Sequence, residues 1–152
     1  MKKEHVSWAS VEDACYGLIG GSKGVGSSDL IIAIGKGGLI PGTIIANRLD
    51  IKLYNYGLSS YDSEDKQGDI FVYQHIELQD IDKSSKILVI DDILDTGETL
   101  KFTENELNTN GYHNLLFRTI HRKTDIKNQY VPNNFESYEE ISSDVWIYYP
   151  WE

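Results

Sequence analysis

The chain has 152 residues, of which 40% are hydrophobic and 25% are charged, so it is neither a disordered chain nor a membrane protein. Its 14 basic and 24 acidic side chains give a formal net charge of −10, which disfavours general binding to nucleic acids. The length suits one domain over residues 1–152. The single cysteine, Cys15, and the lack of an apolar signal segment after Met1 predict a cytoplasmic protein.

The first predicted element is a helix over residues 8–19. Ser10 and Asp13 are placed as a capping box at its start, and Gly20 and Gly21 as its end. A polar segment rich in Gly and Ser follows. We therefore expect the chain to begin with a helix that precedes the first strand.

Strands and helices then alternate along the chain. Continuous apolar runs such as residues 30–34 and 87–90 are typical of buried parallel strands. The polar stretch 59–68 lacks periodicity and predicts a mobile loop. The alternation indicates an α/β fold with a mainly parallel sheet flanked by helices, and ligands bind beyond the carboxyl ends of such strands. Strands are predicted over residues 29–34, 52–56, 70–75, 86–91 and 113–120, and helices over about 40–49 and 98–108.

The segment 89–99, Val-Ile-Asp-Asp-Ile-Leu-Asp-Thr-Gly-Glu-Thr, carries the strongest functional signal. The turn at 95–99 exposes unpaired backbone N–H groups at the positive end of a helix dipole, which predicts a cradle for a phosphate monoester. Gly97 lets the backbone approach the ligand closely. Asp91 and Asp92 are successive strand residues that point in opposite directions, but at a strand end they can reach a cis-diol and its Mg²⁺.

For Asp92 or Asp95 taken singly, an acid that merely caps the next helix is the simpler interpretation. The whole pattern resembles the signature with which type I phosphoribosyltransferases bind phosphoribosyl pyrophosphate (PRPP). This resemblance implies that Asp91 and Asp92 hold the ribose hydroxyls and Mg²⁺, and that Asp95 accepts the N7 proton of a purine. Glu98 departs from the pattern, and its side chain is expected to point to solvent. The resemblance assigns PRPP binding to Asp91, Asp92, Asp95, Thr96, Gly97, Glu98 and Thr99.

Two further stretches resemble loops of the 6-oxopurine enzymes within this family. Ile-Gly-Lys-Gly-Gly-Leu-Ile-Pro-Gly at 34–42 is similar to their pyrophosphate loop, in which glycines let the backbone approach the ligand and a basic side chain adds charge. A glycine-rich turn alone would be weak evidence, since helix starts often contain glycine. Ser60 and Tyr61 resemble the pair on the catalytic loop, whose closure excludes water, although an ordinary exposed connection explains the dipeptide equally well. The pyrophosphate-loop residues are Gly35, Lys36, Gly37 and Gly38.

Two segments, 121–124 and 144–152, resemble the base-binding parts of the bacterial xanthine-guanine phosphoribosyltransferases. Lys123 is expected to donate to the exocyclic O6 of the base, Trp146 to stack on the purine, and Ile147 to offer backbone groups to its edge. The resemblance places Glu152 beside the 2-position and a second metal. Without the resemblance, the simpler interpretation of Lys123 is a solvated surface charge, and aromatic residues such as Trp146 more often belong to a core or an interface.

This sequence departs from the bacterial enzymes at three of these positions. Lys36 stands where they have arginine, Gly35 where they have serine, and Glu152 where they have aspartate and continue further. A longer acid beside a terminal carboxylate is expected to disfavour anionic xanthine relative to guanine or hypoxanthine.

The resemblance as a whole implies a small base-binding hood on the fold and Mg²⁺-assisted transfer of the 5-phosphoribosyl group of PRPP to a 6-oxopurine in purine salvage. It also implies a homo-oligomer, without nucleic-acid partners or stable membrane insertion. Two alternatives stay open: a regulatory PRPP sensor of the same fold, and a phosphoribosyltransferase for adenine or a pyrimidine.

Overall fold

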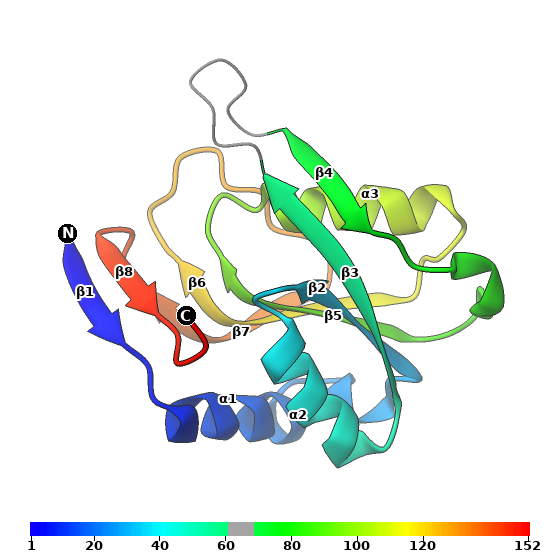
Figure 1. Ribbon diagram of the computed structural model, residues 1–152, viewed down its shortest axis with the longest axis horizontal. Helices are drawn as coiled ribbons and strands as arrows, with labels where there is room; N and C mark the ends of the chain where they lie inside the picture. Colours follow the sequence, from blue (N-terminus) through cyan, green and yellow to red (C-terminus); the bar gives the residue numbers. More distant parts are fainter. Residues whose placement is uncertain (61–68) are drawn as a thin grey trace.

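The computed structural model describes residues 1–60 and 69–152 (Figure 1). No helix in these two ranges is long and apolar enough to cross a bilayer. The helices are α1 (Trp8–Gly21), α2 (Leu39–Leu49) and α3 (Glu98–Thr109), with short 3₁₀ turns η1 (Val25–Ser27) and η2 (Leu78–Asp80). The strands are β1 (Lys2–His5), β2 (Leu30–Gly35), β3 (Lys52–Ser60), β4 (Ile70–Gln74), β5 (Ile87–Leu94), β6 (Leu115–Lys123), β7 (Phe135–Ile141) and β8 (Val145–Tyr148).

A twisted sheet forms the centre of the molecule, with the strand order β4-β3-β2-β5-β6-β7. The pairs β2–β3, β2–β5, β5–β6 and β6–β7 are parallel, and only the edge pair β3–β4 is antiparallel among these strands. β2 and the first half of β5 are buried at every position, because helices cover both faces of this part of the sheet. The predicted mainly parallel α/β fold is confirmed.

The helices divide the apolar side chains between two cores. α1 and α2 cover one face of the sheet and α3 covers the other (Figure 1). Alternation along β5 shows the division, since Leu88 and Ile90 belong to the core under α1 and α2, whereas Ile87 and Val89 belong to the core under α3. By the same alternation Asp91 and Asp92 leave the end of β5 toward opposite faces.

Several element boundaries differ from the sequence-based expectations. The N-cap of α1 is Ser7, whose hydroxyl accepts the N–H of Ser10 at 3.1 Å, so the predicted capping box at Ser10 and Asp13 was wrong. Ser10 lies inside the first turn, where Ser7 satisfies its free N–H. Gly20 and Gly21 are the last helical residues rather than the stop. Ser59 and Ser60 belong to β3 rather than to the loop predicted over 59–68, and residues 61–68 lie outside the described ranges.

β1 and β8 pair in parallel and form a small two-stranded sheet beside the central one (Figure 1). This pairing brings the two ends of the chain together, and the rings of His5 and Tyr148 stack with their centroids 4.9 Å apart. Val145 and Ile147 point from β8 into the core under α1. The pair corresponds to the expected hood and holds the Trp146 segment next to the carboxyl end of the central sheet.

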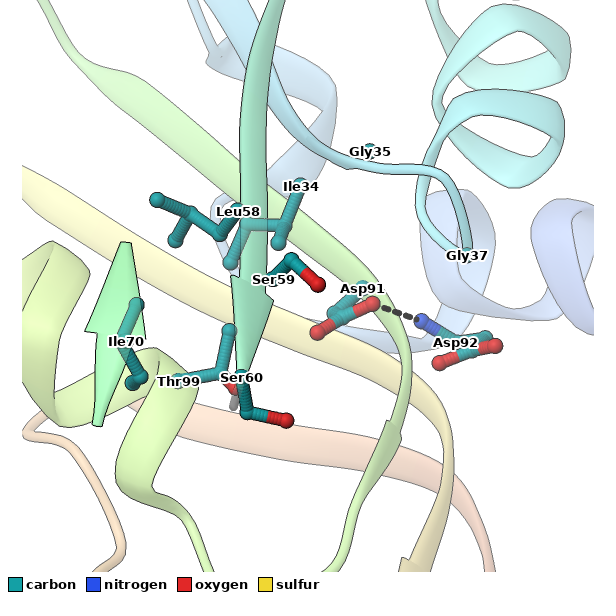
Figure 2. A pocket seen from close by; sticks show the side chains of 10 residues that line it. All are labelled: Ile34, Gly35, Gly37, Leu58, Ser59, Ser60, Ile70, Asp91, Asp92 and Thr99. Carbon is teal, nitrogen blue, oxygen red and sulfur yellow. Dashed lines mark hydrogen bonds between the residues drawn. The ribbon is translucent and has the colours of Figure 1, made fainter. Parts of the chain in front are cut away.

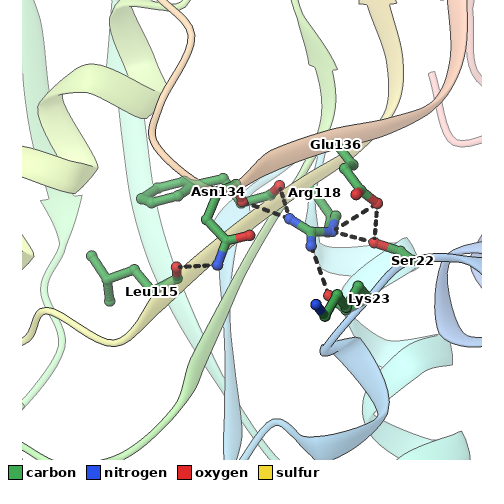
Figure 3. A network of polar contacts seen from close by, with 7 residues as sticks. Ser22, Lys23, Leu115, Arg118, Asn134 and Glu136 are labelled. Atoms are coloured by element: carbon green, nitrogen blue, oxygen red, sulfur yellow. Dashed lines mark hydrogen bonds and ion pairs between the residues drawn. The ribbon is translucent and has the colours of Figure 1, made fainter.

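Arg118 lies in the middle of β6 with only 1% of its surface exposed, and it ties the segment that follows α1 to the start of β7 (Figure 3). Its guanidinium donates to the hydroxyl of Ser22 and to the carbonyl of Lys23 at 3.1 Å. It also donates to the carbonyl of Asn134 at 2.6 Å, and Glu136 lies 3.9 Å away. These partners surround a buried cation with acceptors, so we interpret this network as structural.

Candidate active site

A cavity of about 270 Å³ opens at the carboxyl ends of β2 and β5, and a second one of about 230 Å³ adjoins it over the start of α3. Asp91, Asp92 and Thr99 line both of them. This is the edge of a parallel sheet at which ligands are expected. The first cavity, shown in Figure 2, is lined by Ile34, Gly35, Gly37, Leu58, Ser59, Ser60, Ile70, Asp91, Asp92 and Thr99.

Asp91 and Asp92 place two carboxylates at this edge, and their side chains leave the strand in opposite directions (Figure 2). The backbone N–H of Asp92 donates to Oδ1 of Asp91 at 2.9 Å. Burial, and next the charge of Asp92, raise the pKa of Asp91 well above its ordinary value. Burial also raises the pKa of Asp92, and the charge of Glu152 adds to this shift. The pair therefore favours a ligand that brings positive charge or hydroxyl donors.

The acid pair fits the Mg²⁺ that the family resemblance implies. Among the described residues neither carboxylate forms an ion pair with a basic side chain. The described residues also contain no cluster of three or more His, Cys, Asp or Glu side chains that could hold a metal by itself. Mg²⁺ is usually held by one or two carboxylates together with waters and substrate phosphates, rather than by a closed protein cage. Two acids facing a cavity suit that kind of binding.

The predicted phosphate cradle lies at the junction of β5 and α3. Gly97 is the N-cap of α3 and has φ 87°, a left-handed conformation that glycine adopts without strain. Within the described part of the chain, the backbone N–H groups of Thr96 and Gly97 have no protein acceptor. Glu98 is exposed and lines the second cavity, whereas Thr99 lines both cavities. Free N–H groups at a helix start are well suited to a phosphate.

The predicted pyrophosphate loop runs from the end of β2 to the start of α2. Gly35 and Gly37 line the first cavity, and Lys36 between them is exposed. The Gly35–Lys36 peptide bond is cis. A side chain at Gly37 would overlap the Asp92 carboxylate, and one at Gly38 would overlap the carbonyl of Ile90. Glycine is therefore required here for the loop to pass close to the end of β5.

Lys123, at the end of β6, is buried rather than a solvated surface charge. Its side chain is 8% exposed, and its ammonium lies 3.2 Å from Oδ2 of Asp95. The same ammonium lies 5.4 Å from the centroid of the Trp146 ring. Trp146 itself is 46% exposed, so part of its ring is open to a ligand. An acid, a cation and an aromatic ring from three segments thus meet beside the phosphate cradle.

The remaining predicted residues fall in different places. The Ile147 side chain is buried in the core, which leaves only its backbone for the predicted contact with a base. Glu152 is exposed, but its charge acts on Asp92. Ser60 lines the first cavity. Tyr61 lies outside the described residues.

Comparison with known proteins supports this interpretation of the site. The family model "Phosphoribosyl transferase domain" matches residues 7–125, which include the acid pair, the phosphate cradle and Lys123. The chain belongs to the phosphoribosyltransferase family.

Individual relatives agree with the family model. A xanthine-guanine phosphoribosyltransferase of Desulfotalea psychrophila is 34% identical over 80% of this chain and 69% of its own length. Another, from Roseobacter denitrificans, is 28% identical over 97% of this chain and 84% of its own length. The crystal structure of a purine phosphoribosyltransferase from Pyrococcus horikoshii superposes with a TM-score of 0.82 at 25% identity and covers 100% of this chain and 95% of that one. The predicted resemblance to the purine branch of the family is confirmed.

One residue that supports this phosphoribosyltransferase site was not predicted from the sequence. The Tyr149 hydroxyl donates to the backbone carbonyl of Asp92 at 3.1 Å and lies 2.7 Å from Nδ1 of His121. The Trp151 ring stacks on Tyr149, with centroids 4.8 Å apart. Tyr149 thereby fixes the C-terminal segment against the acid pair. No local pattern marks it, because it is one of four aromatic residues among the seven at 145–151.

Proposed function

We propose that the chain transfers the 5-phosphoribosyl group of PRPP to a 6-oxopurine base, giving the nucleoside monophosphate and pyrophosphate in purine salvage. The observation that carries the proposal is the contact between Asp95 and Lys123 at 3.2 Å, next to the exposed ring of Trp146 and the phosphate cradle. The purine names of the relatives support the same substrate class.

One edge of a 6-oxopurine has hydrogen-bonding groups that complement Lys123 and Asp95. O6 and N7 are neighbours on one edge of the base. A lysine ammonium can only donate, which suits O6, and an ionised Asp95 can only accept, which suits an N7 proton. Adenine carries an amino group in place of O6, so two hydrogen-bond donors, this amino group and the Lys123 ammonium, would face each other. The contact therefore favours guanine, hypoxanthine or xanthine.

The reaction is a displacement at the anomeric carbon of PRPP. N9 of the base forms a bond to that carbon, while the bond to the pyrophosphate oxygen breaks and its electron pair leaves with pyrophosphate. Asp95 accepts the N7 proton as the new bond forms, a general-base role that requires proximity. Trp146 and Lys123 hold the base in line with the carbon, and Thr96 to Thr99 hold the 5-phosphate at the other end of the substrate.

Mg²⁺ belongs to this proposal as the family's cofactor. Asp91 and Asp92 would hold it together with the ribose hydroxyls, and Glu152 would contribute at a second position near the base. When bound, the ion neutralises charge on the pyrophosphate. The exposed Lys36 acts on the same group from the protein side.

A turnover assay with PRPP and Mg²⁺ tests the proposal against guanine, hypoxanthine, xanthine, adenine and orotate. We expect nucleotide from the 6-oxopurines only. Asp95→Asn should lower kcat by about 100-fold or more, because the proton acceptor is lost. Asp80→Asn, the same change at an exposed acid in η2, is the matched control and should keep full activity. Binding of PRPP without turnover of any base would instead indicate a regulatory sensor.

The choice among 6-oxopurines is proposed to depend on Glu152. Its carboxylate is close enough to Asp92 to raise the pKa of that acid, so it adds negative potential to the base end of the site. Such a field disfavours anionic xanthine relative to guanine or hypoxanthine. Glu152→Gln should therefore raise kcat/KM for xanthine more than for guanine. Equal efficiency with both bases in the unmodified protein would contradict this preference.

A homo-oligomeric state and a cytoplasmic location complete the proposal. Trp8 supports the former, since it is 55% exposed at the start of α1, and large exposed aromatic side chains are enriched at protein interfaces. Light scattering coupled to gel filtration gives the number of subunits directly. Fractionation of cells that express a tagged chain gives the location.

A further inference from the structure

The loop between β6 and β7, residues 124–134, contacts the phosphate cradle from the side opposite the cavity. Gln129 has the central place in this contact. Its side-chain Nε2 donates to the backbone carbonyl of Asp95 and to that of Lys123, both at 2.7 Å. Its Oε1 accepts from Nε of Arg122 at 3.1 Å. One amide thus joins the start of the cradle to the end of β6, the two segments that carry the base-recognition pair.

The next residue extends this contact through its backbone. The N–H of Tyr130 donates to the carbonyl of Thr96 at 2.9 Å. The carbonyl of Tyr130 lies so close to Gly97 that a side chain there would overlap it. The loop therefore contacts the backbone of every residue from Asp95 to Gly97.

These contacts determine which way the cradle's N–H groups point. In a planar trans peptide, the carbonyl of one residue and the N–H of the next point in opposite directions. Since the carbonyls of Asp95 and Thr96 face the β6–β7 loop, the N–H groups of Thr96 and Gly97 face away from it. The cavity over 91–100 lies on that side, and Gln129 and Tyr130 do not line it.

The loop itself is anchored to α3, so it can act as a fixed support. Glu104 is 5% exposed, and its carboxylate accepts from the hydroxyl of Tyr130 and, at 3.2 Å, from the N–H of Asn133. The ammonium of Lys101 lies 5.6 Å from the centroid of the Tyr130 ring. A loop anchored to a helix in this way holds the groups it contacts in place better than an unanchored loop does.

We propose that Gln129 is a positioning residue that aligns the phosphate cradle with Lys123, so that PRPP and the base are held in the relative position that the reaction requires. The proposal rests on the proposed function for its substrates. Gln129 touches neither substrate and acts through the carbonyls of Asp95 and Lys123. Its effect is therefore expected in the KM for PRPP and in base discrimination, rather than in folding.

Gln129→Met tests the proposal, because it keeps the side-chain length and removes both donors. We expect the KM for PRPP to rise about tenfold to a hundredfold, as the cradle's N–H groups lose their orientation. Lys123 also becomes less fixed, so the ratio of kcat/KM for guanine to that for adenine should fall. Neither quantity depends on the fraction of correctly folded enzyme. Gln79→Met, the same change at an exposed glutamine whose amide donates to Glu77 at 2.7 Å, is the matched control.

A second variant and a second measurement complete the test. Gln129→Glu keeps the acceptor for Arg122 but turns an acid toward two carbonyls, so it should raise the KM for PRPP further. Calorimetric titration with ribose 5-phosphate measures the cradle without any turnover and should show weaker binding in both variants. Unchanged KM and unchanged ribose 5-phosphate affinity, even with a lower kcat, would overturn the proposal. If the unmodified chain bound ribose 5-phosphate but turned over no base, the proposed function would fail, while the titrations would still decide the role of Gln129.

Discussion

Two charged regions, one buried and one half-buried, lie on neighbouring strands of the same sheet and differ in how their charge is compensated. Arg118 on β6 pairs with Ile90 on β5, and the next position along β5 is Asp91. The Arg118 guanidinium is surrounded by carbonyls, a hydroxyl and Glu136 (Figure 3). The acid pair has no basic partner among the described residues and faces a cavity (Figure 2).

The difference separates a charge that serves folding from a pair of charges that serves a ligand. Burial lowers the pKa of Arg118, but Glu136 opposes the shift and the hydrogen bonds are satisfied within the chain. At Asp91, burial and the charge of Asp92 act in the same direction and raise its pKa. A folded protein keeps such uncompensated charge where function requires it, at a cost in stability. The two regions should therefore respond oppositely when their charge is removed.

The largest effect is expected from Asp91→Asn, which removes one charge and keeps an acceptor for the N–H of Asp92. Activity should fall by about 100- to 1,000-fold, since a group proposed to hold the ribose and Mg²⁺ is lost. The free energy of unfolding should rise by about 0.5–2 kcal/mol at pH 7.5. The sign follows from the raised pKa of Asp91: the folded state binds the proton more readily than the unfolded state, so stability is lost as pH rises above the unfolded-state value. Urea unfolding in metal-free buffer and steady-state kinetics measure the two quantities.

Asp82→Asn is the control for the gain in stability expected from Asp91→Asn, because it makes the same change at an acid with a lowered pKa. Asp82 accepts the N–H and the hydroxyl of Ser84 at 2.8 and 2.7 Å, and these hydrogen bonds lower its pKa. Its ionised form is therefore favoured in the folded state, and the same substitution should destabilise the protein slightly without affecting activity. If Asp91→Asn also destabilised the protein, the acid pair would be a structural feature like Arg118.

The second largest effect is expected from Arg118→Met, which keeps the bulk of the side chain and removes the cation. The carbonyls of Lys23 and Asn134 lose a buried donor, so the free energy of unfolding should fall by about 3 kcal/mol. The KM for PRPP should be unchanged at temperatures where the variant is folded, because the network lies away from the cavities. Thermal unfolding with parallel kinetics checks both expectations. A change in KM with little loss of stability would contradict the structural role.

A smaller effect is expected at the acidic end of the same network. Glu136→Gln removes a carboxylate that is 51% exposed and 3.9 Å from Arg118. A partly exposed pair contributes at most about 1 kcal/mol, and the glutamine can still accept from Ser22. A urea midpoint close to that of the unmodified protein would show that the buried carbonyls, rather than the ion pair, hold Arg118. A loss as large as that of Arg118→Met would show the reverse.

The sheet centre and the phosphate site could be predicted from the sequence because their signals are local. The buried runs of β2 and β5 are continuous, and the acids and glycines that follow them stand next to one another in the chain. β1, β7 and β8 were missed for the opposite reason. β7 reads Phe-Glu-Ser-Tyr-Glu-Glu-Ile with most side chains exposed, and β1 is polar and pairs with a strand from the other end of the chain. Polar edge strands are stabilised by partners that no local pattern reveals.

The base end of the site shows the same limit for single residues. Sequence alone leaves Lys123 between a surface charge and a ligand-binding residue, and only the fold brings it to Asp95 and Trp146. Gln129 and Tyr149 carry no recognisable signal, since their roles depend on the backbone carbonyls of Asp95, Lys123 and Asp92. Contacts from side chain to distant backbone are therefore the part of this site that required the structure.

The smallest effect is expected at His121, a buried base. The compensation of its charge is intermediate between that of Arg118 and that of the acid pair. Its Nδ1 contacts the Tyr149 hydroxyl, and its Nε2 lies 3.6 Å from a Glu139 carboxylate that is 61% exposed. Burial lowers the pKa of His121, while Glu139 and then Glu4 oppose the shift.

The unfolded state therefore binds the His121 proton more readily, and stability present above pH 6.5 is lost as the pH falls through the lowered value. His121→Gln, neutral at every pH, should flatten this loss in urea titrations between pH 7.5 and 5, by less than the changes at Arg118. Glu139→Gln should steepen it, because removing the opposing charge lowers the pKa of His121 further. A slope in Glu139→Gln equal to that of the unmodified protein would mean that Glu139 does not compensate His121, which would place this residue with the acid pair rather than with Arg118.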